Sequence, residues 1–230
     1  MTLKELNIRK YIAMPINHSI IEKIETTCTM HQARWVAVTK MRSLETLQAL
    51  YQTGKRQFGE NKAQELCDKY VALPKDIEWH FIGHLQTNKV KSIIDKVSFI
   101  HSVDSRKLLD TIQREAKAVS KNISIFIQIH IAEEETKYGF SLEEVIDFFS
   151  KFKKEDFPNI HIVGLMAMAS LTDNQAQIKN EFLSVKKLKD TINTQFQLEL
   201  KEISMGMSGD YEIALECGAT YIRIGSILFE

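Results

Sequence analysis

A lysine follows a short apolar run near the start of the chain, at a position where an amine could do chemistry. The run Trp35-Val36-Ala37-Val38-Thr39 leads to Lys40, and a segment with helical periodicity follows at 44–51. This order predicts a buried parallel strand at 35–40 that leads into a helix. Ligands collect at the carboxyl ends of such strands, and a lysine partly removed from water there gives up its proton readily and can attack an aldehyde. The alternative is an ordinary solvent-exposed lysine, one of 30 Lys and Arg residues in the chain.

Two turns of small residues near the end of the chain could bind a phosphate group. Ser208 and Gly209 follow one predicted strand and open a predicted helix, while Gly225 and Ser226 end the last predicted strand. Hydroxyl groups and backbone N–H groups at such strand ends, beside the positive end of a helix, are typical phosphate ligands. Each turn alone is compatible with an ordinary helix cap or glycine turn. The two together, at neighbouring strand ends, favour a phosphate site.

An arginine lies two residues before the second of these turns. Alternation along the strand places Arg223 on the same face as Tyr221 and Gly225, toward the inside of a barrel. A guanidinium there requires a partner because it keeps its proton. That partner is either a ligand or a structural salt bridge, for example to Glu60. A lysine amine, a phosphate cradle and an inward arginine together indicate a phosphorylated aldehyde cofactor.

These residues need a scaffold that brings strand ends together, and the rest of the sequence predicts one. Apolar runs alternate about eight times with segments of helical period, which is the pattern of a single (β/α)8 TIM-type barrel, one α/β domain over residues 1–230. A doubly wound open sheet is the alternative, but no Gly-x-Gly-x-x-Gly motif follows the first strand. The predicted strands lie at 35–40, 57–61, 78–83, 97–103, 124–131, 160–168, 202–207 and 220–226. The predicted helices lie at 44–54, 62–73, 84–95, 105–120, from 141 onward, 173–196 and 208–217.

An extra amphipathic helix precedes the first strand. Residues 2–31 have helical character, with a break near Pro15 and with Asn17 or Ser19 available to cap the second part. We expect this segment to pack outside the barrel. Further along the chain, Ser141 and Glu144 have the spacing of a capping box at the start of a helix.

The composition narrows the classes of function. The 230 residues are 44% hydrophobic and include 30 acidic and 30 basic residues, so the net charge indicates neither a nucleic-acid surface nor a polybasic membrane anchor. The 3 cysteines lack CxxC spacing and the 7 histidines, including His130, lack zinc spacing, so we expect no metal site. No signal peptide or membrane-spanning apolar run is recognisable. We expect a cytoplasmic monomer that binds a small ligand.

Six motifs occur in a distinctive order along the chain. They are Phe58-Gly59-Glu60-Asn61, His80-Phe81-Ile82-Gly83-His84-Leu85-Gln86-Thr87-Asn88-Lys89, His101-Ser102-Val103-Asp104, Gly164-Leu165-Met166, Ser204-Met205-Gly206-Met207-Ser208 and Arg223-Ile224-Gly225-Ser226. These motifs resemble those of the YggS/PROSC family, the pyridoxal phosphate homeostasis proteins. The resemblance covers essentially the whole chain, and it implies the barrel fold of the N-terminal domain of alanine racemase.

The resemblance also assigns roles to individual residues. It implies that Lys40 forms a Schiff base with pyridoxal 5′-phosphate (PLP) and that Arg223 faces the pyridine nitrogen. The implied phosphate ligands are Ser208, Gly225 and Ser226, and the side chains implied to line the cofactor are those of Asn61, His80 and Met166.

The sequence departs from the family pattern at two places. The family usually continues with Ile-Phe-Gly and a short basic tail where this chain ends at Phe229-Glu230, and it often has asparagine at the position of His130. The implied role is to bind PLP and to balance vitamin B6 pools without catalytic turnover, with PLP-dependent apoenzymes as transient recipients of the cofactor. The competing function is that of a PLP-dependent amino-acid racemase, for which a loop tyrosine such as Tyr138 could be a base. A third alternative is a barrel enzyme that acts on phosphorylated sugars and uses Lys40 as its Schiff-base lysine.

Overall fold

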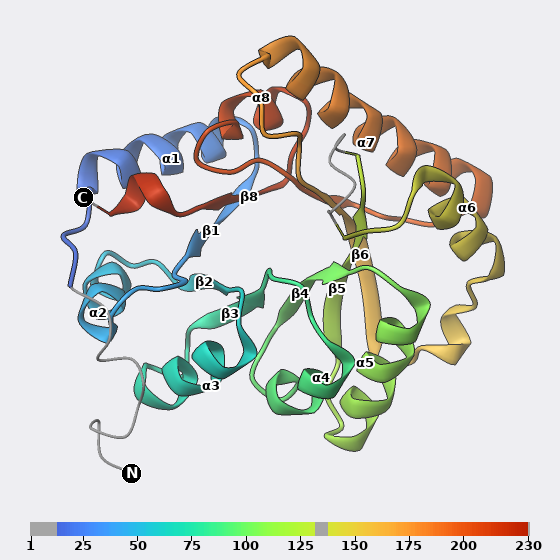
Figure 1. Ribbon diagram of the computed structural model, residues 1–230, viewed down its shortest axis with the longest axis horizontal. Helices are drawn as coiled ribbons and strands as arrows, with labels where there is room; N and C mark the ends of the chain where they lie inside the picture. Colours follow the sequence, from blue (N-terminus) through green and yellow to red (C-terminus); the bar gives the residue numbers. More distant parts are fainter. Residues whose placement is uncertain (1–12, 132–137, 230) are drawn as a thin grey trace.

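Eight parallel strands close into a barrel in the computed structural model, which describes residues 13–131 and 138–229 (Figure 1). The strands pair in chain order, and β1 also pairs with β8 in register from Arg34↔Tyr221 to Ala37↔Ile224. Because this last pairing closes the sheet, the predicted barrel is confirmed and the open sheet is wrong. The strands are β1 Arg34–Val38, β2 Gln57–Glu60, β3 Glu78–Phe81, β4 Phe99–Val103, β5 Ile123–Ile129, β6 Ile160–Ala167, β7 Glu202–Ser204 and β8 Tyr221–Ile224.

Helices follow the strands and surround the barrel as an outer ring in Figure 1. They are α2 Leu44–Gln52, α3 Ala63–Ala72, α4 Thr87–Ile93, α5 Arg106–Ala118, α6 Leu142–Lys151, α7 Gln175–Phe196 and α8 Tyr211–Glu216, with 3-10 turns η2 Lys154–Asp156 and η3 Ser226–Leu228. The capping box predicted at Ser141 and Glu144 starts α6. Among the described residues, no helix combines the length and the apolar character needed to cross a membrane.

A further helix, α1 His18–Met30, lies outside the barrel as predicted. It begins at Asn17, whose Oδ1 accepts the N–H of Ile20 at 3.1 Å. The backbone N–H of Asn17 donates to the carbonyl of Leu228 at 3.0 Å, so α1 starts beside the end of the chain (Figure 1). The first part of the predicted helical segment, residues 2–12, lies outside the described residues.

The first strand is shorter than predicted. It ends at Val38, and Lys40 lies in the turn that follows. Met41 adopts a left-handed backbone conformation with φ 59°, and the N–H of Arg42 donates to the carbonyl of Thr39 at 3.2 Å. The prediction that the strand continues to Lys40 is wrong because this turn bends the chain away from the sheet.

The last β/α unit also differs from its prediction. β7 ends at Ser204, three residues earlier than predicted, and Gly206 follows with a positive φ of 92°. The helix predicted from residue 208 begins at Tyr211, because residues 208–210 form a separate turn and Asp210 has a non-helical φ of −139°. Ser208 therefore lies in a turn before α8, not at the helix start.

Apolar side chains fill two layers of the molecule. The larger layer lies between the strands and the surrounding helices. A smaller cluster, formed by Val36, Phe126, Met166 and Tyr221, fills the inside of the barrel. Because the interior is packed with side chains, a ligand has room only beyond the strand ends, where turns follow the strands.

Candidate functional site

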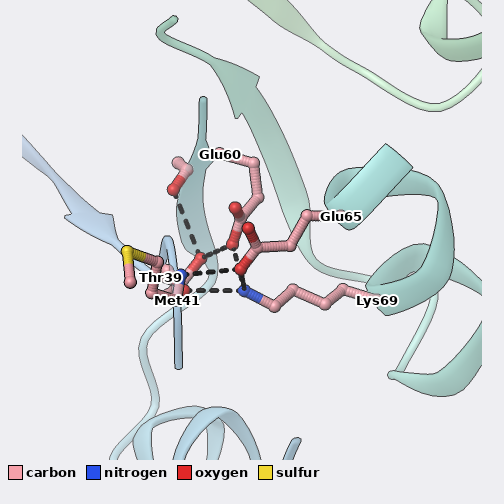
Figure 2. A network of polar contacts seen from close by, with 6 residues as sticks. Thr39, Met41, Glu60, Glu65 and Lys69 are labelled. Atoms are coloured by element: carbon pink, nitrogen blue, oxygen red, sulfur yellow. Dashed lines mark hydrogen bonds and ion pairs between the residues drawn. The ribbon is translucent and has the colours of Figure 1, made fainter. Parts of the chain in front are cut away.

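Helix α3 holds the turn that carries Lys40 through hydrogen bonds to the residue before it and to the residue after it (Figure 2). The carbonyl of Thr39 accepts a hydrogen bond from Lys69 Nζ at 2.7 Å, and the N–H of Met41 donates to Glu65 Oε1 at 2.6 Å. The peptide groups that flank Lys40 are therefore fixed, although the Lys40 side chain itself is exposed. The expectation that Lys40 is partly removed from water is wrong, because the residue lies in an exposed turn.

The same buried charges form a compact cluster under this turn. Lys69 Nζ donates to Glu60 Oε1 and to Glu65 Oε1, both at 2.6 Å, and Thr39 Oγ1 donates to Glu60 Oε1 at 2.6 Å (Figure 2). The side chains of Lys69 and Glu60 are both 0% exposed. Burial raises the pKa of Glu60 to about 7, and Lys69 opposes this shift.

This cluster excludes one interpretation of Arg223. Glu60 lies on the outward face of β2, toward α3, and its cationic partner is Lys69. Arg223 lies on the inward face of β8, where its Nη1 donates to Ser204 Oγ at 2.7 Å and its Nη2 donates to the carbonyl of Ala167 at 3.0 Å. The suggested salt bridge between Arg223 and Glu60 is therefore wrong.

Arg223 itself lies inside the barrel, as strand alternation predicts. Only 4% of the residue is exposed. Burial lowers the pKa of Arg223 to about 10, while the Asp210 carboxylate opposes the shift. The guanidinium therefore still carries its proton at neutral pH and presents a buried positive charge.

The two predicted phosphate turns lie against each other. The N–H of Gly225 donates to Ser208 Oγ at 3.1 Å, and this bond leaves the Ser208 hydroxyl hydrogen for another acceptor. A Cβ added at Gly225 would lie 3.2 Å from Val38 Cβ, so this turn packs closely on the end of β1, two residues before Lys40. Ser226 is exposed at the start of η3, and a Cβ added at Gly209 would contact nothing within 4 Å.

The three residues implied to line a cofactor lie in different surroundings. Asn61 follows β2, and its buried Oδ1 has no hydrogen-bond partner among the described residues. His80 is fully buried, with Nδ1 2.9 Å from His101 Nε2 and Nε2 3.0 Å from Glu78 Oε1. Met166 packs in the cluster inside the barrel. Asn61 thus has an unsatisfied acceptor, whereas both ring nitrogens of His80 already have hydrogen-bond partners. The lining roles of all three residues stay predictions.

The residues at this end of the barrel fit a phosphorylated aldehyde with a ring nitrogen. They supply a primary amine at Lys40, the Ser208 hydroxyl at the paired turns, an inward guanidinium at Arg223 and an unsatisfied amide oxygen at Asn61. In the described part of the chain, no group of three His, Cys, Asp or Glu side chains gathers as a metal site does.

Sequence reasoning missed the residues that hold this set in place. Glu65 and Lys69 are four residues apart on a helix, a spacing that is typical of exposed ion pairs and so gave no reason to place them in the core. His101 and Ser204 contact each other across 103 residues. Both occur in the motifs that carry the family resemblance, which was the one available signal for them.

Comparison with known proteins shows the class to which this protein belongs. Residues 19–230 match the family model described as "Alanine racemase, N-terminal domain". A protein of Aquifex aeolicus named pyridoxal phosphate homeostasis protein is 36% identical over 218 residues, which cover 91% of this chain and 94% of that protein. The protein of the same name from Helicobacter pylori strain 26695 is 38% identical over 213 residues, covering 91% and 93%. The chain belongs to the pyridoxal phosphate homeostasis protein family, which confirms the resemblance to YggS/PROSC proteins.

Solved structures agree with this assignment. PipY of Synechococcus elongatus, determined without PLP, superposes with a TM-score of 0.84 at 30% identity and covers 92% of this chain and 100% of its own. The structure of PipY with PLP bound gives a TM-score of 0.79 at 29% identity, with the same two coverages. An alanine racemase of Clostridium difficile, at 12% identity and a TM-score of 0.70, shares the fold alone.

Proposed function

We propose that this protein binds PLP covalently at Lys40 and serves vitamin B6 homeostasis as a carrier of the cofactor. The observation that carries the proposal is the contact between Gly225 and Ser208, two predicted phosphate ligands, directly beside the end of the strand that leads to Lys40. The names of the relatives and the PLP-bound PipY structure support it.

Each residue of the set has a defined task in this proposal. PLP supplies an aldehyde that condenses with a primary amine and releases water. Lys40 provides that amine from a turn whose backbone is fixed by α3. Ser208, Gly225 and Ser226 would hold the phosphate, Arg223 would donate to the pyridine nitrogen, and Asn61 and Met166 would line the cofactor.

We propose further that the protein has no appreciable amino-acid turnover. Cleaving a Cα–H bond requires placed bases and a strong electron sink in the cofactor ring. Arg223 keeps its proton at neutral pH, so it donates a hydrogen bond to a ring nitrogen but leaves the ring neutral. The neutral ring favours a carrier over a racemase. Tyr138, the loop tyrosine considered as a base, is 55% exposed and stacks on the ring of His84 at 3.7 Å between centroids.

Covalent trapping tests the central assignment. Borohydride reduction of the PLP-loaded protein, followed by peptide mapping, should find the label on the peptide that contains Lys40. Lys40→Ala should lose the visible absorption band, whereas Lys62→Ala and Lys89→Ala, which remove exposed lysines near Asn61, should keep it. A label on Lys62 or Lys89 would overturn the assignment, and a colourless wild-type protein would favour the phosphorylated-sugar enzyme.

The partners and the location belong to the same proposal. PLP-dependent apoenzymes are the proposed transient recipients, the protein acts as a monomer, and it resides in the cytoplasm. Activation of a PLP-dependent apoenzyme by the loaded protein, at a rate faster than spontaneous release of PLP, would support transfer to a recipient. Equal rates of PLP loss from the protein with and without the apoenzyme would contradict it.

A further inference from the structure

Five polar side chains from four strands form a continuous line of hydrogen bonds through the barrel interior. Arg223 Nη1 lies 2.7 Å from Ser204 Oγ, which lies 2.8 Å from His101 Nδ1. His101 Nε2 lies 2.9 Å from His80 Nδ1, and His80 Nε2 lies 3.0 Å from Glu78 Oε1. The line runs from β8 through β7 and β4 to Glu78, the first residue of β3.

The two ends of the line, together with neutral histidines, fix the direction of every bond in it. A guanidinium only donates and a carboxylate only accepts. Arg223 therefore donates to Ser204, whose own O–H donates to Nδ1 of His101. A neutral imidazole has one donor and one acceptor, so His101 donates from Nε2 to His80, and His80 donates from Nε2 to the carboxylate. One proton arrangement satisfies all four bonds, with both histidines neutral and protonated on Nε2.

Burial supports this neutral arrangement. The ring of His80 stacks on Phe99 with 4.6 Å between centroids, and that of His101 stacks on Phe126 with 4.4 Å. Burial lowers the pKa of His80, and it lowers the pKa of His101 well below the usual value. Reversing the bonds between Ser204 and His80 would require a doubly protonated His80, which its burial disfavours.

We propose that His80, His101 and Ser204 are positioning residues for the cofactor ring and that they act through Arg223. The inference rests on the proposed function, because it takes Arg223 as the partner of the pyridine nitrogen. With Nη1 bonded to Ser204 and Nη2 to a backbone carbonyl, the guanidinium has a fixed orientation. Aligned hydrogen bonds that end in a carboxylate polarise one another, and this strengthens the bond between Arg223 and Ser204. Glu78, at the amino end of the barrel, is thereby coupled to the cofactor ring.

The hydrogen-bond direction can be measured without any cofactor. Ring nitrogen-15 NMR of the apoprotein, assigned with His80→Phe and His101→Phe, should show both histidines protonated on Nε2. Neither should titrate between about pH 6 and pH 8, where an ordinary histidine does. An Nδ1–H tautomer, or an ordinary titration of either ring, would overturn the proposed line.

The coupling between this line of hydrogen bonds and the cofactor is tested on the PLP-loaded protein. Ser204→Ala removes the bond to Arg223, so it should shift the visible absorption maximum and weaken PLP retention about threefold to tenfold, the equivalent of one hydrogen bond. Ser204→Thr, which keeps a hydroxyl, should restore both properties. Phe126→Leu, a packing change next to His101, should lower stability without moving the absorption maximum.

These outcomes separate the inference from the proposed function. If the wild-type protein binds no PLP at Lys40, the proposed function fails while the NMR result still decides the line of hydrogen bonds. If PLP binds at Lys40 and Ser204→Ala leaves both its absorption maximum and its retention unchanged, the positioning role is refuted. If Ser204→Ala and Phe126→Leu move the maximum equally, the effect belongs to packing and the positioning role is likewise refuted.

Discussion

Ser208 joins the two candidate phosphate turns, because its Oγ accepts the N–H of Gly225 at 3.1 Å. Ser208→Ala removes this acceptor and also the hydroxyl donor proposed for the phosphate. We expect the variant to retain PLP about tenfold more weakly, since a hydrogen bond to a charged group contributes roughly 1.5–3 kcal/mol. Equilibrium dialysis would measure the change.

Unphosphorylated pyridoxal is the matched control for this variant. Its affinity should be low for the wild-type protein and nearly unchanged by Ser208→Ala, because it has no phosphate to lose. A wild-type protein that binds pyridoxal and PLP with the same affinity would contradict the phosphate cradle.

The residues proposed to touch a ligand are easier to recognise in the sequence than the residues that hold them in place. Lys40 and Arg223 are recognisable because each lies at or near the carboxyl end of an apolar run in the sequence. Lys69 is not, because its pairing with Glu65 resembles an ordinary exposed helix pair, and its burial depends on how α3 docks on the barrel. Ser204 gives no local signal, since its partners come from other strands.

At the scale of elements, α3 carries the charge that holds the Lys40 turn. Lys69→Met leaves the carboxylates of Glu60 and Glu65 in the core without their cation. The free energy of unfolding should fall by about 3–5 kcal/mol, the usual cost of breaking a buried ion pair from one side. Urea denaturation at neutral pH would measure it.

Lys62→Met is a control for the same helix, because Lys62 precedes α3, is exposed and makes no capping bond through its side chain. It should change the stability by less than about 0.5 kcal/mol, as surface substitutions usually do. If Lys69→Met lowered the free energy of unfolding as little as the control does, the buried cluster would not stabilise the fold.

Element order was predictable, but several element ends were not. Apolar periodicity identified all eight strands because each one buries side chains on both faces. The ends of β1 and β7 depend on the positive φ angles of Met41 and Gly206. Methionine rarely adopts such a conformation, so the early end of β1 had no signal in the sequence.

At the scale of the whole molecule, buried groups give stability an optimum in pH. The pKa values of His80 and His101 are lowered from 6.5, so the unfolded chain binds more protons than the native one below about pH 6.5, and stability falls as the pH drops through that value. Glu60 acts oppositely, because its pKa is raised from 4.5 to about 7 and its contribution is lost as the pH rises through 7. Below about pH 6.5 the two histidines change the free energy of unfolding more than the one carboxyl group does. We therefore expect maximal stability near neutral pH.

Urea denaturation as a function of pH tests this balance. Glu60→Gln should remove the opposing contribution, so stability should rise more steeply from about pH 4.5 to pH 6.5 and should no longer decline between pH 6.5 and about pH 7. A wild-type stability that keeps falling from about pH 5 to pH 7 would contradict the dominance of the two histidines.

The proposed absence of amino-acid turnover is tested on the whole loaded protein. With saturating L-alanine and other L-amino acids in deuterium oxide, we expect no exchange of the Cα hydrogen on the timescale of ordinary enzymes. NMR of the amino acid follows the exchange directly. Exchange or inversion on the order of 1 s⁻¹, the low end of usual enzyme turnover, would restore the racemase.

The closure of the barrel between β1 and β8 has a thermodynamic consequence. Lys40 follows the first strand, whereas Ser208 and Gly225 follow the last two, so the proposed ligand attaches to both ends of the sheet at once. The unfolded chain holds these residues far apart and cannot bind them together. Binding to the native state alone adds about 2.7 kcal/mol to its stability at a hundredfold excess of ligand over Kd. The melting temperature should therefore rise with PLP concentration and stay constant with inorganic phosphate at the same concentration. In a cell, resistance of this protein to proteolysis would then track the supply of the cofactor.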